Sequence, residues 1–471
     1  MEKPTIILAT SNGVGMGHLA RASAVAIALK EVANPIIVSM AGGIAEVPAF
    51  MGIRCEYIPG KDRMWMSREK WDIYLRDRLL ALVEETGAKV LSFDGVVPYP
   101  GVIAAKNANP NLKLVWVRRG LWQKKPQRFI LGLQSKMMDK IIEPGDIARA
   151  YDFGPTAKRK DSVLTSPVSL FRKEDALSRD DARRALGLDL NRPTALVQLG
   201  TGDSDVNEKM TAALSGLIGW KDLQVILTKA PVDKDGKSLV PEGLDLKVVR
   251  YFPLANVLHA FDAGICATGY NGVHELLPAQ VPTVFVSNIR GTDDQEARAK
   301  WCNDFGFALR ADQANLADIT EKVKMLQDPL VRKGLSDKCA ELPNTTGGQE
   351  IAAMLYQLAV EQKPARAKTF TFVRLMAQDH INRGLRHVAN LGLRRVALVY
   401  RFLNPHIKVQ EIDQAPPVFG DHITAAELHP LIKSATRFEH MIQGASVNYR
   451  KRREEIAFAA YGKEMIVTKT K

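Results

Sequence analysis

The sequence has few cysteines, no long hydrophobic run and no recognisable leader. Its four cysteines, Cys55, Cys266, Cys302 and Cys339, are far apart and form no Cys-x-x-Cys pair. This excludes a disulfide scaffold and the usual spacing of a structural zinc site, and it favours a reducing compartment. No apolar run reaches the roughly 18 residues that cross a bilayer, and no basic stretch precedes an apolar segment and cleavage site, so we expect no signal peptide. These absences predict a cytoplasmic protein, free or attached to the cytoplasmic face of a membrane.

Positive charge is concentrated near the C-terminus. The formal net charge is +13, and residues 364–471 hold 18 Lys and Arg against 9 Asp and Glu. Residues 370–404 fit an amphipathic helix, with Ile381 and Leu385 on one side and arginines such as Arg383 on the other. We expect this basic segment to bind an anionic membrane surface; the alternative is that its apolar side packs on the rest of the chain. No nucleic-acid partner is expected, because the basic residues lack the aromatic interleaving of a binding module.

Strand-like and helix-like stretches alternate through most of the chain. The strand-like runs lie at 5–9, 35–40, 89–94, 112–117, 194–199, 223–227, 246–250, 263–267 and 282–286. Such alternation is typical of a parallel sheet covered by helices, with ligands bound at the carboxyl ends of the strands. Two such series are present, and each opens with a strand followed by a glycine-rich loop. We therefore predict an α/β protein of two Rossmann-like αβα domains, at 1–155 and 165–362, that face across a cleft. A basic, mainly helical extension at 363–471 would follow.

A glycine-rich loop follows the first predicted strand and opens a helix. It reads Gly13-Val14-Gly15-Met16-Gly17-His18. Glycine lets the backbone approach a ligand, a helix N-terminus favours negative charge, and histidine exchanges a proton near neutral pH. The loop does not match the Gly-x-Gly-x-x-Gly pattern, and no carboxylate ends the second strand, which argues against a dinucleotide cofactor.

A second segment carries the most specific signal in the chain. It reads Ala267-Thr268-Gly269-Tyr270-Asn271-Gly272-Val273-His274-Glu275 and is followed by Thr292-Asp293-Asp294-Gln295-Glu296. Together with the N-terminal loop, this segment resembles inverting glycosyltransferases of the GT-B fold that use UDP-sugars. The peptidoglycan lipid I N-acetylglucosaminyltransferases and the monogalactosyldiacylglycerol synthases are the nearest groups. The resemblance covers about residues 5–360 and implies the GT-B architecture and a UDP-sugar donor, with no further cofactor.

The resemblance places the donor site in the second domain. The implied nucleotide-sugar contacts are Gly200, Thr201, Gly202, Phe252, Leu254, Thr268, Gly269, Gly272, Glu275, Asp294 and Gln295. Glu275 would bind the ribose hydroxyls, the glycines would meet the diphosphate, and Asp294 with Gln295 would hold the sugar. Plainer alternatives are a glutamate favoured by its helix N-terminus, a tight turn without ligand, core packing of Phe252 and Leu254, and a solvated loop.

The first domain is expected to supply the acceptor side and the catalytic base. The acceptor-side loop consists of Gly13, Gly15, Met16 and Gly17. His18 would remove the proton of the acceptor hydroxyl, and Asp94, at a strand end of the same domain, would orient the imidazole. The alternative for His18 is a structural loop histidine. The loop reads Gly-Met-Gly-His where the resembled families have Gly-Gly-His, so a bulky side chain is added here. No Asp-x-Asp motif ends a strand, and no metal is expected.

The sequence thus predicts an inverting glycosyltransferase that moves a sugar from a nucleotide-sugar to a hydroxyl of a lipid-linked or cell-surface glycan. Arg118 and Arg119 follow a strand and are candidates for an anionic acceptor or donor phosphate, or form a solvated pair. Two other functions stay open. One is a UDP-sugar epimerase of the same fold, although its early Gly-Thr-Arg-Pro-Glu loop is missing. The other is a non-catalytic sugar-nucleotide-binding assembly partner, against which the presence of His18 and Glu275 argues.

Overall fold

The computed structural model describes most of the first 362 residues and a short part of the C-terminal extension. The described residues are 2–11, 17–40, 48, 51–61, 68–124, 129–200, 204–228, 240–249, 251–288, 292–362, 365, 367–378 and 381. Outside them lie Gly13, Gly15, Met16, Thr201, Gly202 and residues 382–404 of the predicted amphipathic segment.

The first unit contains a parallel sheet whose described strands run in the order β3-β2-β1-β4-β5-β6-β7. Their bounds are β1 Thr5–Thr10, β2 Asn34–Ser39, β3 Arg54–Tyr57, β4 Val90–Asp94, β5 Lys113–Val117, β6 Lys140–Glu143 and β7 Val163–Leu164. Strand β1 pairs with β2 on one side and β4 on the other, so the strand order reverses beside β1. Ligands bind at such a switch point, outside the carboxyl ends of the strands, and there Thr10 lies next to Asp94.

The second unit repeats this plan with a parallel sheet in the order β10-β9-β8-β11-β12-β13. Its strands are β8 Thr194–Gln198, β9 Gln224–Leu227, β10 Asp245–Val248, β11 Ala263–Ala267, β12 Thr283–Val286 and β13 Leu309–Ala311. The switch point lies between β8 and β11. Gly200 and Thr268 follow the carboxyl ends of these two strands, so both predicted donor loops leave the sheet at one place. The predicted α/β fold with two parallel sheets is confirmed.

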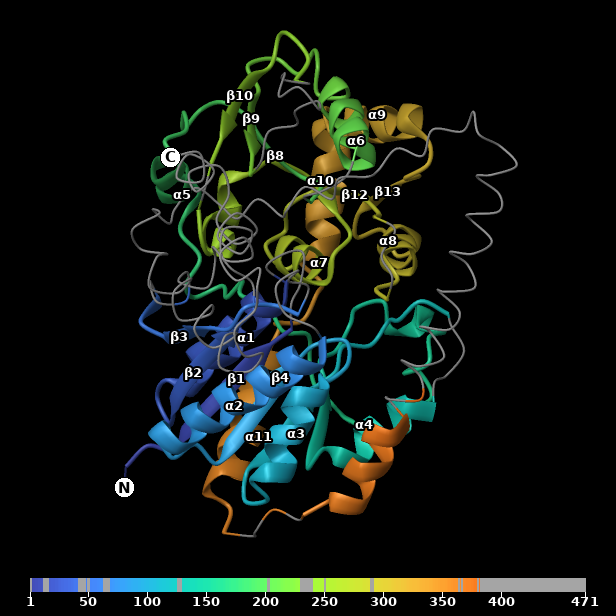
Figure 1. Cartoon of the computed structure of the whole chain (residues 1–471). Helices are drawn as coiled ribbons and strands as arrows, with labels where there is room; N and C mark the ends of the chain where they lie inside the picture. Colours follow the sequence, from blue (N-terminus) through green and yellow to red (C-terminus); the bar gives the residue numbers. More distant parts are fainter. Residues whose placement is uncertain are drawn as a thin grey trace, which may run out of the picture.

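Helices cover both sheets (Figure 1). In the first unit they are α1 Gly17–Leu29, α2 Arg68–Thr86, α3 Pro100–Ala108, α4 Phe129–Met137 and the 3-10 helix η2 Arg149–Tyr151. Later in the chain they are α5 Arg179–Leu186, α6 Ser204–Ser215, η3 Leu254–Ala260, α7 Tyr270–Leu276, α8 Gln295–Asp304, α9 Leu316–Met325, α10 Pro329–Cys339 and α11 Gly347–Val360. Several begin at side-chain caps, as when Ser178 accepts a hydrogen bond from the Asp181 N–H at the start of α5. No described helix is both long enough and apolar enough to cross a membrane.

Three apolar clusters hold the layers together. One lies between the first sheet and α2 and α3, and another lies between the second sheet and α6 and α9. The third includes residues of both units, from Leu8 and Val25 to Phe261 and Val273. Because this third cluster is continuous, the two units share buried apolar surface as well as polar contacts.

Helix α11 returns from the second unit to the first (Figure 1). It packs against α1, β1 and β4, and the Lys113 ammonium donates to the Leu358 carbonyl at 2.9 Å. Its first residue, Gly347, must be glycine, since a Cβ there would collide with the Ser166 carbonyl oxygen. The domain bounds predicted from the sequence place α11 in the second domain, 165–362. In the structure this helix packs on the first unit and completes its helical layer.

Candidate active site

His18 and Asp94 lie together at the carboxyl edge of the first sheet. Helix α1 begins at Gly17, so His18 is in its first turn, and Asp94 is the last residue of β4. The His18 Nδ1 atom is 2.6 Å from Asp94 Oδ1, and the side chains are 17% and 8% exposed. The predicted pair is therefore brought within hydrogen-bond distance from positions 76 residues apart.

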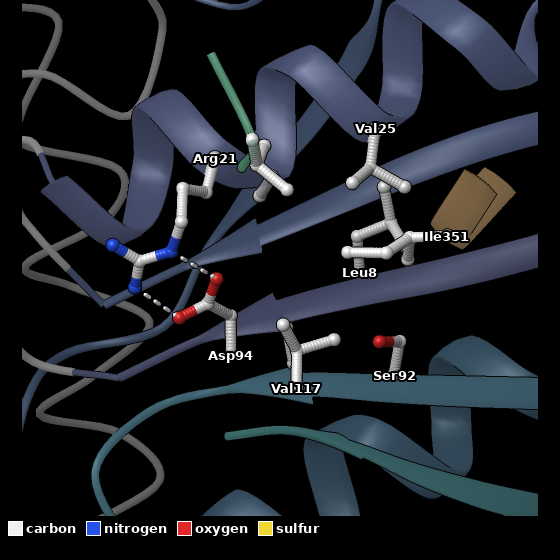
Figure 2. Close-up of a pocket in the computed structure, with 10 residues that line it drawn as sticks. Leu8, Arg21, Val25, Ser92, Asp94, Val117 and Ile351 are labelled. Atoms are coloured by element: carbon white, nitrogen blue, oxygen red, sulfur yellow. Dashed lines mark hydrogen bonds and ion pairs between the residues drawn. The ribbon is translucent and has the colours of Figure 1, made fainter. Parts of the chain in front are cut away.

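Arg21 completes this cluster and was not predicted from the sequence. Its Nε atom donates to Asp94 Oδ2 at 2.9 Å and its terminal nitrogen to Asp94 Oδ1 at 2.6 Å (Figure 2). Behind the carboxylate lies a small cavity with mostly apolar walls, which include Leu8 and Val117. The sequence held one signal for Arg21: it stands three residues after His18, and side chains at that spacing share a helix face.

The cluster leaves the imidazole neutral and the carboxylate charged. Burial on its own would raise the pKa of Asp94, but the charge of Arg21 and the bond from His18 bring it down to about 2. Burial lowers the pKa of His18 and outweighs the opposing influence of Asp94. A neutral imidazole that donates from Nδ1 to Asp94 keeps Nε2 as a proton acceptor.

The predicted donor segment forms the turn from β11 into α7. A Cβ at Gly269 would meet nothing within 4 Å, so there is open space before the helix. The Glu275 carboxylate is half-buried and accepts a hydrogen bond from the Leu170 N–H, and burial raises its pKa to about 8. The Thr268 side chain is fully buried, and its hydroxyl lies 3.3 Å from that of Ser287, so its contact with a nucleotide-sugar remains a prediction. Gly272 is a helical residue within α7.

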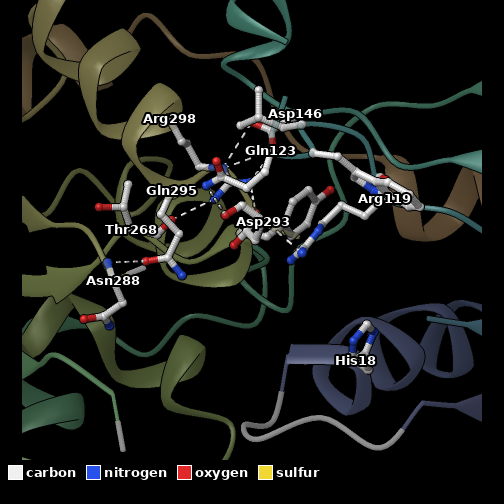
Figure 3. Close-up of polar contacts among 12 residues, drawn as sticks. His18, Arg119, Gln123, Asp146, Thr268, Asn288, Asp293, Gln295 and Arg298 are labelled. Atoms are coloured by element: carbon white, nitrogen blue, oxygen red, sulfur yellow. Dashed lines mark hydrogen bonds and ion pairs between the residues drawn. The ribbon is translucent and has the colours of Figure 1, made fainter. Parts of the chain in front are cut away.

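Asp294 and Gln295 make contacts within the protein. Asp294 caps α8 by accepting a hydrogen bond from the Ala297 N–H at 3.0 Å. Gln295 is 6% exposed and accepts from the Asn288 N–H at 2.9 Å (Figure 3). Contact of Asp294 and Gln295 with the sugar remains a prediction. The hydrogen bonds described here would have to persist beside the sugar contacts or be replaced by them.

The remaining predicted site residues lie at positions that suit their predicted roles, but none of their contacts distinguishes ligand binding from a structural role. Gly200, two residues after β8, has a φ of 100°, a conformation that favours glycine. Phe252 and Leu254 are half-buried and pack against the shared apolar cluster, which suits core packing as well as contact with a nucleobase. The Gly17 carbonyl accepts a hydrogen bond from Asn271 Nδ2 at 3.2 Å, which joins the start of α1 to α7.

A buried ionic network links the two units beside this site (Figure 3). The fully buried Arg298 donates to Asp146 Oδ2 at 2.8 Å and to Asp293 Oδ1 at 2.9 Å. Asp146 follows β6 in the first unit, whereas Asp293 and Arg298 belong to the second. Burial would raise the pKa of Asp293, but Arg119 and Arg298 lower it to about 2. Sequence reasoning did not find this network, because Asp146 lies 152 residues before Arg298 in the chain.

The two adjacent arginines have different surroundings. Arg118 is fully buried against Glu143 and Asp161, which makes it a structural ion-pair residue. Arg119 is 16% exposed, lies 3.5 Å from Asp293 Oδ1 and acts electrostatically on His18. Of the two arginines predicted as candidates for binding an anion, Arg119 is therefore the one that lies at the site.

Helix α7 also contacts the first unit directly. The Tyr270 hydroxyl donates to the Gly145 carbonyl at 2.7 Å, and His274 Nε2 accepts from the Ile147 N–H at 3.1 Å. Burial lowers the pKa of His274 to about 4, so this imidazole is neutral and structural. These bonds hold the helix that carries Glu275 against the unit that carries His18.

The arrangement offers a proton acceptor on one unit and a half-buried carboxylate on the other. Within the described residues, no group of three or more His, Cys, Asp and Glu side chains could hold a metal ion. The residues around the site can remove a proton, bind hydroxyl groups through Glu275 and meet negative charge at the start of α7.

Comparisons with known proteins give the class. No protein-family model matches the chain. It is 32% identical over 190 residues to a UDP-N-acetylglucosamine–N-acetylmuramyl-(pentapeptide) pyrophosphoryl-undecaprenol N-acetylglucosamine transferase of Nocardioides sp., covering 39% of this chain and 51% of that protein. The protein with the same name from Rhodococcus opacus is 24% identical over 385 residues, which cover 78% and 99% of the two chains. The chain spans between 32% and 51% of the length of the first curated relatives it matches.

Among solved structures, a glycosyltransferase from Rickettsia africae superposes with a TM-score of 0.54 at 13% identity, covering 77% of this chain and all of that one. A UDP-N-acetylglucosamine 2-epimerase structure reaches 0.51 at 11% identity, so the fold by itself does not separate transfer from epimerisation. The chain has the two-domain GT-B fold, which the glycosyltransferase and the epimerase structures share. In sequence it is distantly similar to the N-acetylglucosamine transferases named above.

Proposed function

We propose that this protein is an inverting glycosyltransferase that moves a sugar from a UDP-sugar to a hydroxyl of a lipid-linked or cell-surface glycan. The observation that carries the proposal is the buried His18–Asp94 pair, which lies at the start of α1 where this helix meets α7. A neutral imidazole held by a carboxylate is suited to remove a hydroxyl proton. The curated relatives, whose printed name describes such a transfer, support the same chemistry.

The reaction is a single displacement at the anomeric carbon. The acceptor oxygen forms a bond to this carbon as the bond from the carbon to the UDP phosphate oxygen breaks. The acceptor proton goes to His18 Nε2, and UDP leaves with the bonding electron pair. A positioned base contributes about 10²–10⁴-fold to such a step. The N-terminus of α7 and Arg119 would meet the negative charge that develops on the leaving diphosphate.

Donor recognition is assigned to the second unit. Glu275 would accept hydrogen bonds from both ribose hydroxyls, and Gly269 would let the diphosphate approach the start of α7. Gly200 and the adjoining loop would form the other side of the phosphate site. Two O–H donors stabilise an ionised carboxylate, so donor binding would release the proton that burial keeps on Glu275 at neutral pH.

Attachment to a membrane surface would bring the protein to a lipid-linked acceptor. In the described part of the extension, Leu375 is 1% exposed and packs on the first unit, whereas Phe370 and Val373 are 82% and 58% exposed. An exposed apolar face followed by the basic residues of the sequence to 404 suits a surface with anionic headgroups. We therefore place the protein at the cytoplasmic face of a membrane.

A transfer assay tests the proposal. Radiolabelled UDP-sugars are incubated with the protein and a bacterial lipid extract, and the products are separated into UDP, free sugar, epimer and labelled lipid. We expect labelled lipid and UDP from the wild type, and at least a 10²-fold slower reaction from His18→Ala. An epimer without UDP release would favour the epimerase, and full activity of His18→Ala would overturn the assignment of the base.

A further inference from the structure

We propose that Arg21 is a positioning residue that fixes the Asp94 carboxylate and, together with burial, keeps His18 neutral, with its outer nitrogen free to accept a proton. The inference rests on the proposed function, because Arg21 has this task only if His18 is the base. Arg21 is 3% exposed and therefore acts through Asp94 and His18 and does not contact substrate.

The two donors of the cluster share one carboxylate oxygen. The Arg21 terminal nitrogen and His18 Nδ1 both lie 2.6 Å from Asp94 Oδ1, and they are 2.8 Å from each other. A proton on Nε2 would make the imidazole a cation in contact with the guanidinium. Like charges at this separation, away from water, disfavour the imidazolium form.

Without Arg21 the balance would shift toward the charged imidazole. A buried carboxylate beside a histidine favours the imidazolium, as the influence of Asp94 on His18 already indicates. A protonated His18 cannot accept the acceptor proton, so such a shift would lower the fraction of active base. Arg21 opposes the shift, because it satisfies both oxygens of Asp94 and neutralises the charge of the carboxylate.

The other charged and titratable groups near the cluster do not replace Arg21. Arg119, from the loop after β5, also disfavours a charged His18, but its nearest carboxylate is Asp293 at 3.5 Å. Asp293 and Tyr270 of the second unit face Arg21 electrostatically. Asp293 is already bound to Arg298, and the Tyr270 ring lies 5.2 Å from the guanidinium and supports its outer face.

Two substitutions separate the charge of Arg21 from its geometry. In Arg21→Gln we expect the pKa of His18, measured by NMR titration, to rise by about 1–2 units. The pH at which kcat/KM falls on the acid side of its profile should shift upward with the His18 pKa. Arg21→Lys keeps the charge but loses the paired bonds, so its pH profile should stay near that of the wild type while kcat falls. An unchanged His18 pKa in Arg21→Gln would overturn the inference.

A control and a direct measurement accompany these variants. Arg183 is also fully buried and is bound to Asp262 away from the site, so Arg183→Gln reports the loss of a buried arginine alone and should not move the pH profile. Nitrogen chemical shifts of the wild type test the tautomer without any variant. We expect Nδ1–H and a bare Nε2 at pH 7, and an imidazolium or the opposite tautomer would overturn the inference.

A failure of the proposed function can be told apart from a failure of the role proposed for Arg21. If His18→Gln transfers sugar at the wild-type rate, His18 is not the base, whatever Arg21 does. If His18→Gln is inactive and Arg21→Gln keeps the wild-type His18 pKa and pH profile, only the role of Arg21 fails.

Discussion

Replacing Arg298 by methionine should cost more stability than any other single change in the ionic network. The side chain is fully buried and donates to Asp146, to Asp293 and, at 2.8 Å, to the Thr268 carbonyl. The variant leaves two carboxylates, 4% and 8% exposed, without the guanidinium that they share, although Arg119 remains 3.5 Å from Asp293. Removing one member of a buried ion pair costs about 3–5 kcal/mol. We expect a loss in this range in the free energy of unfolding at pH 7, measured by urea denaturation with tryptophan fluorescence.

The pH dependence of this loss identifies its cause. In the wild type the pKa values of both carboxyl groups are lowered, that of Asp293 to about 2. Their contribution to stability is present above the unfolded value of 3.8 and is lost as the pH falls through about 2. In Arg298→Met, burial should raise the pKa of Asp146 more than that of Asp293, because Arg119 still lies beside Asp293. The variant should therefore recover stability relative to the wild type as these groups protonate between pH 7 and pH 4.

A matched control and a second variant complete this experiment. Arg183→Met removes an equally buried arginine that faces one carboxylate, Asp262, and should not show the same acid recovery. The double variant Arg298→Met/Asp146→Asn removes one of the stranded charges and should regain about 1 kcal/mol or more. A loss below about 1 kcal/mol in Arg298→Met that is independent of pH would refute the reasoning.

Three further predictions concern the site and the extension. Asp94→Asn removes the negative charge that orients and stabilises the His18 imidazole and should lower kcat by about 10²-fold or more with little change in KM, in a steady-state assay; a wild-type kcat would contradict its role. The raised pKa of Glu275 stabilises the fold below the unfolded value of 4.5, and this contribution is lost as the pH rises through about 8. Glu275→Gln should therefore lose less stability than the wild type between pH 5 and pH 9 in thermal unfolding. Phe370→Asp should reduce co-sedimentation with anionic vesicles but not with the neutral vesicles used as control; equal binding of the variant and the wild type to anionic vesicles would exclude this face.

Much of the fold could be predicted from the sequence because long aliphatic strands alternate with helices. Runs such as residues 5–9 and 263–267 became central strands of the two parallel sheets. Short edge strands were missed, including β3 and β13, because they hold four and three residues and carry polar side chains. The return of α11 to the first unit was also missed, since amphipathic spacing does not say which sheet a helix covers.

The candidate site was only partly predictable. His18 and Asp94 were paired because one follows a strand and the other ends a strand at the same sheet edge. Arg21 was overlooked because an arginine on a helix is usually exposed. The hydroxyl of Thr268 and the side chain of Gln295 are expected to reach ligand, and the structure adds hydrogen bonds inside the unit that the sequence did not indicate. Motif residues indicate a site, whereas side-chain direction depends on neighbours that the motif does not contain.

Nucleotide-sugar binding tests the central claim most directly. A thermal-shift screen compares UDP-, dTDP- and GDP-sugars on the wild type, His18→Ala and Glu275→Ala. We predict that UDP-sugars raise the unfolding temperature of the wild type and of His18→Ala, because the base lies outside the donor site. The shift should be lost or strongly reduced in Glu275→Ala. If no nucleotide-sugar shifts the unfolding temperature of the wild type, the protein is not the glycosyltransferase proposed here.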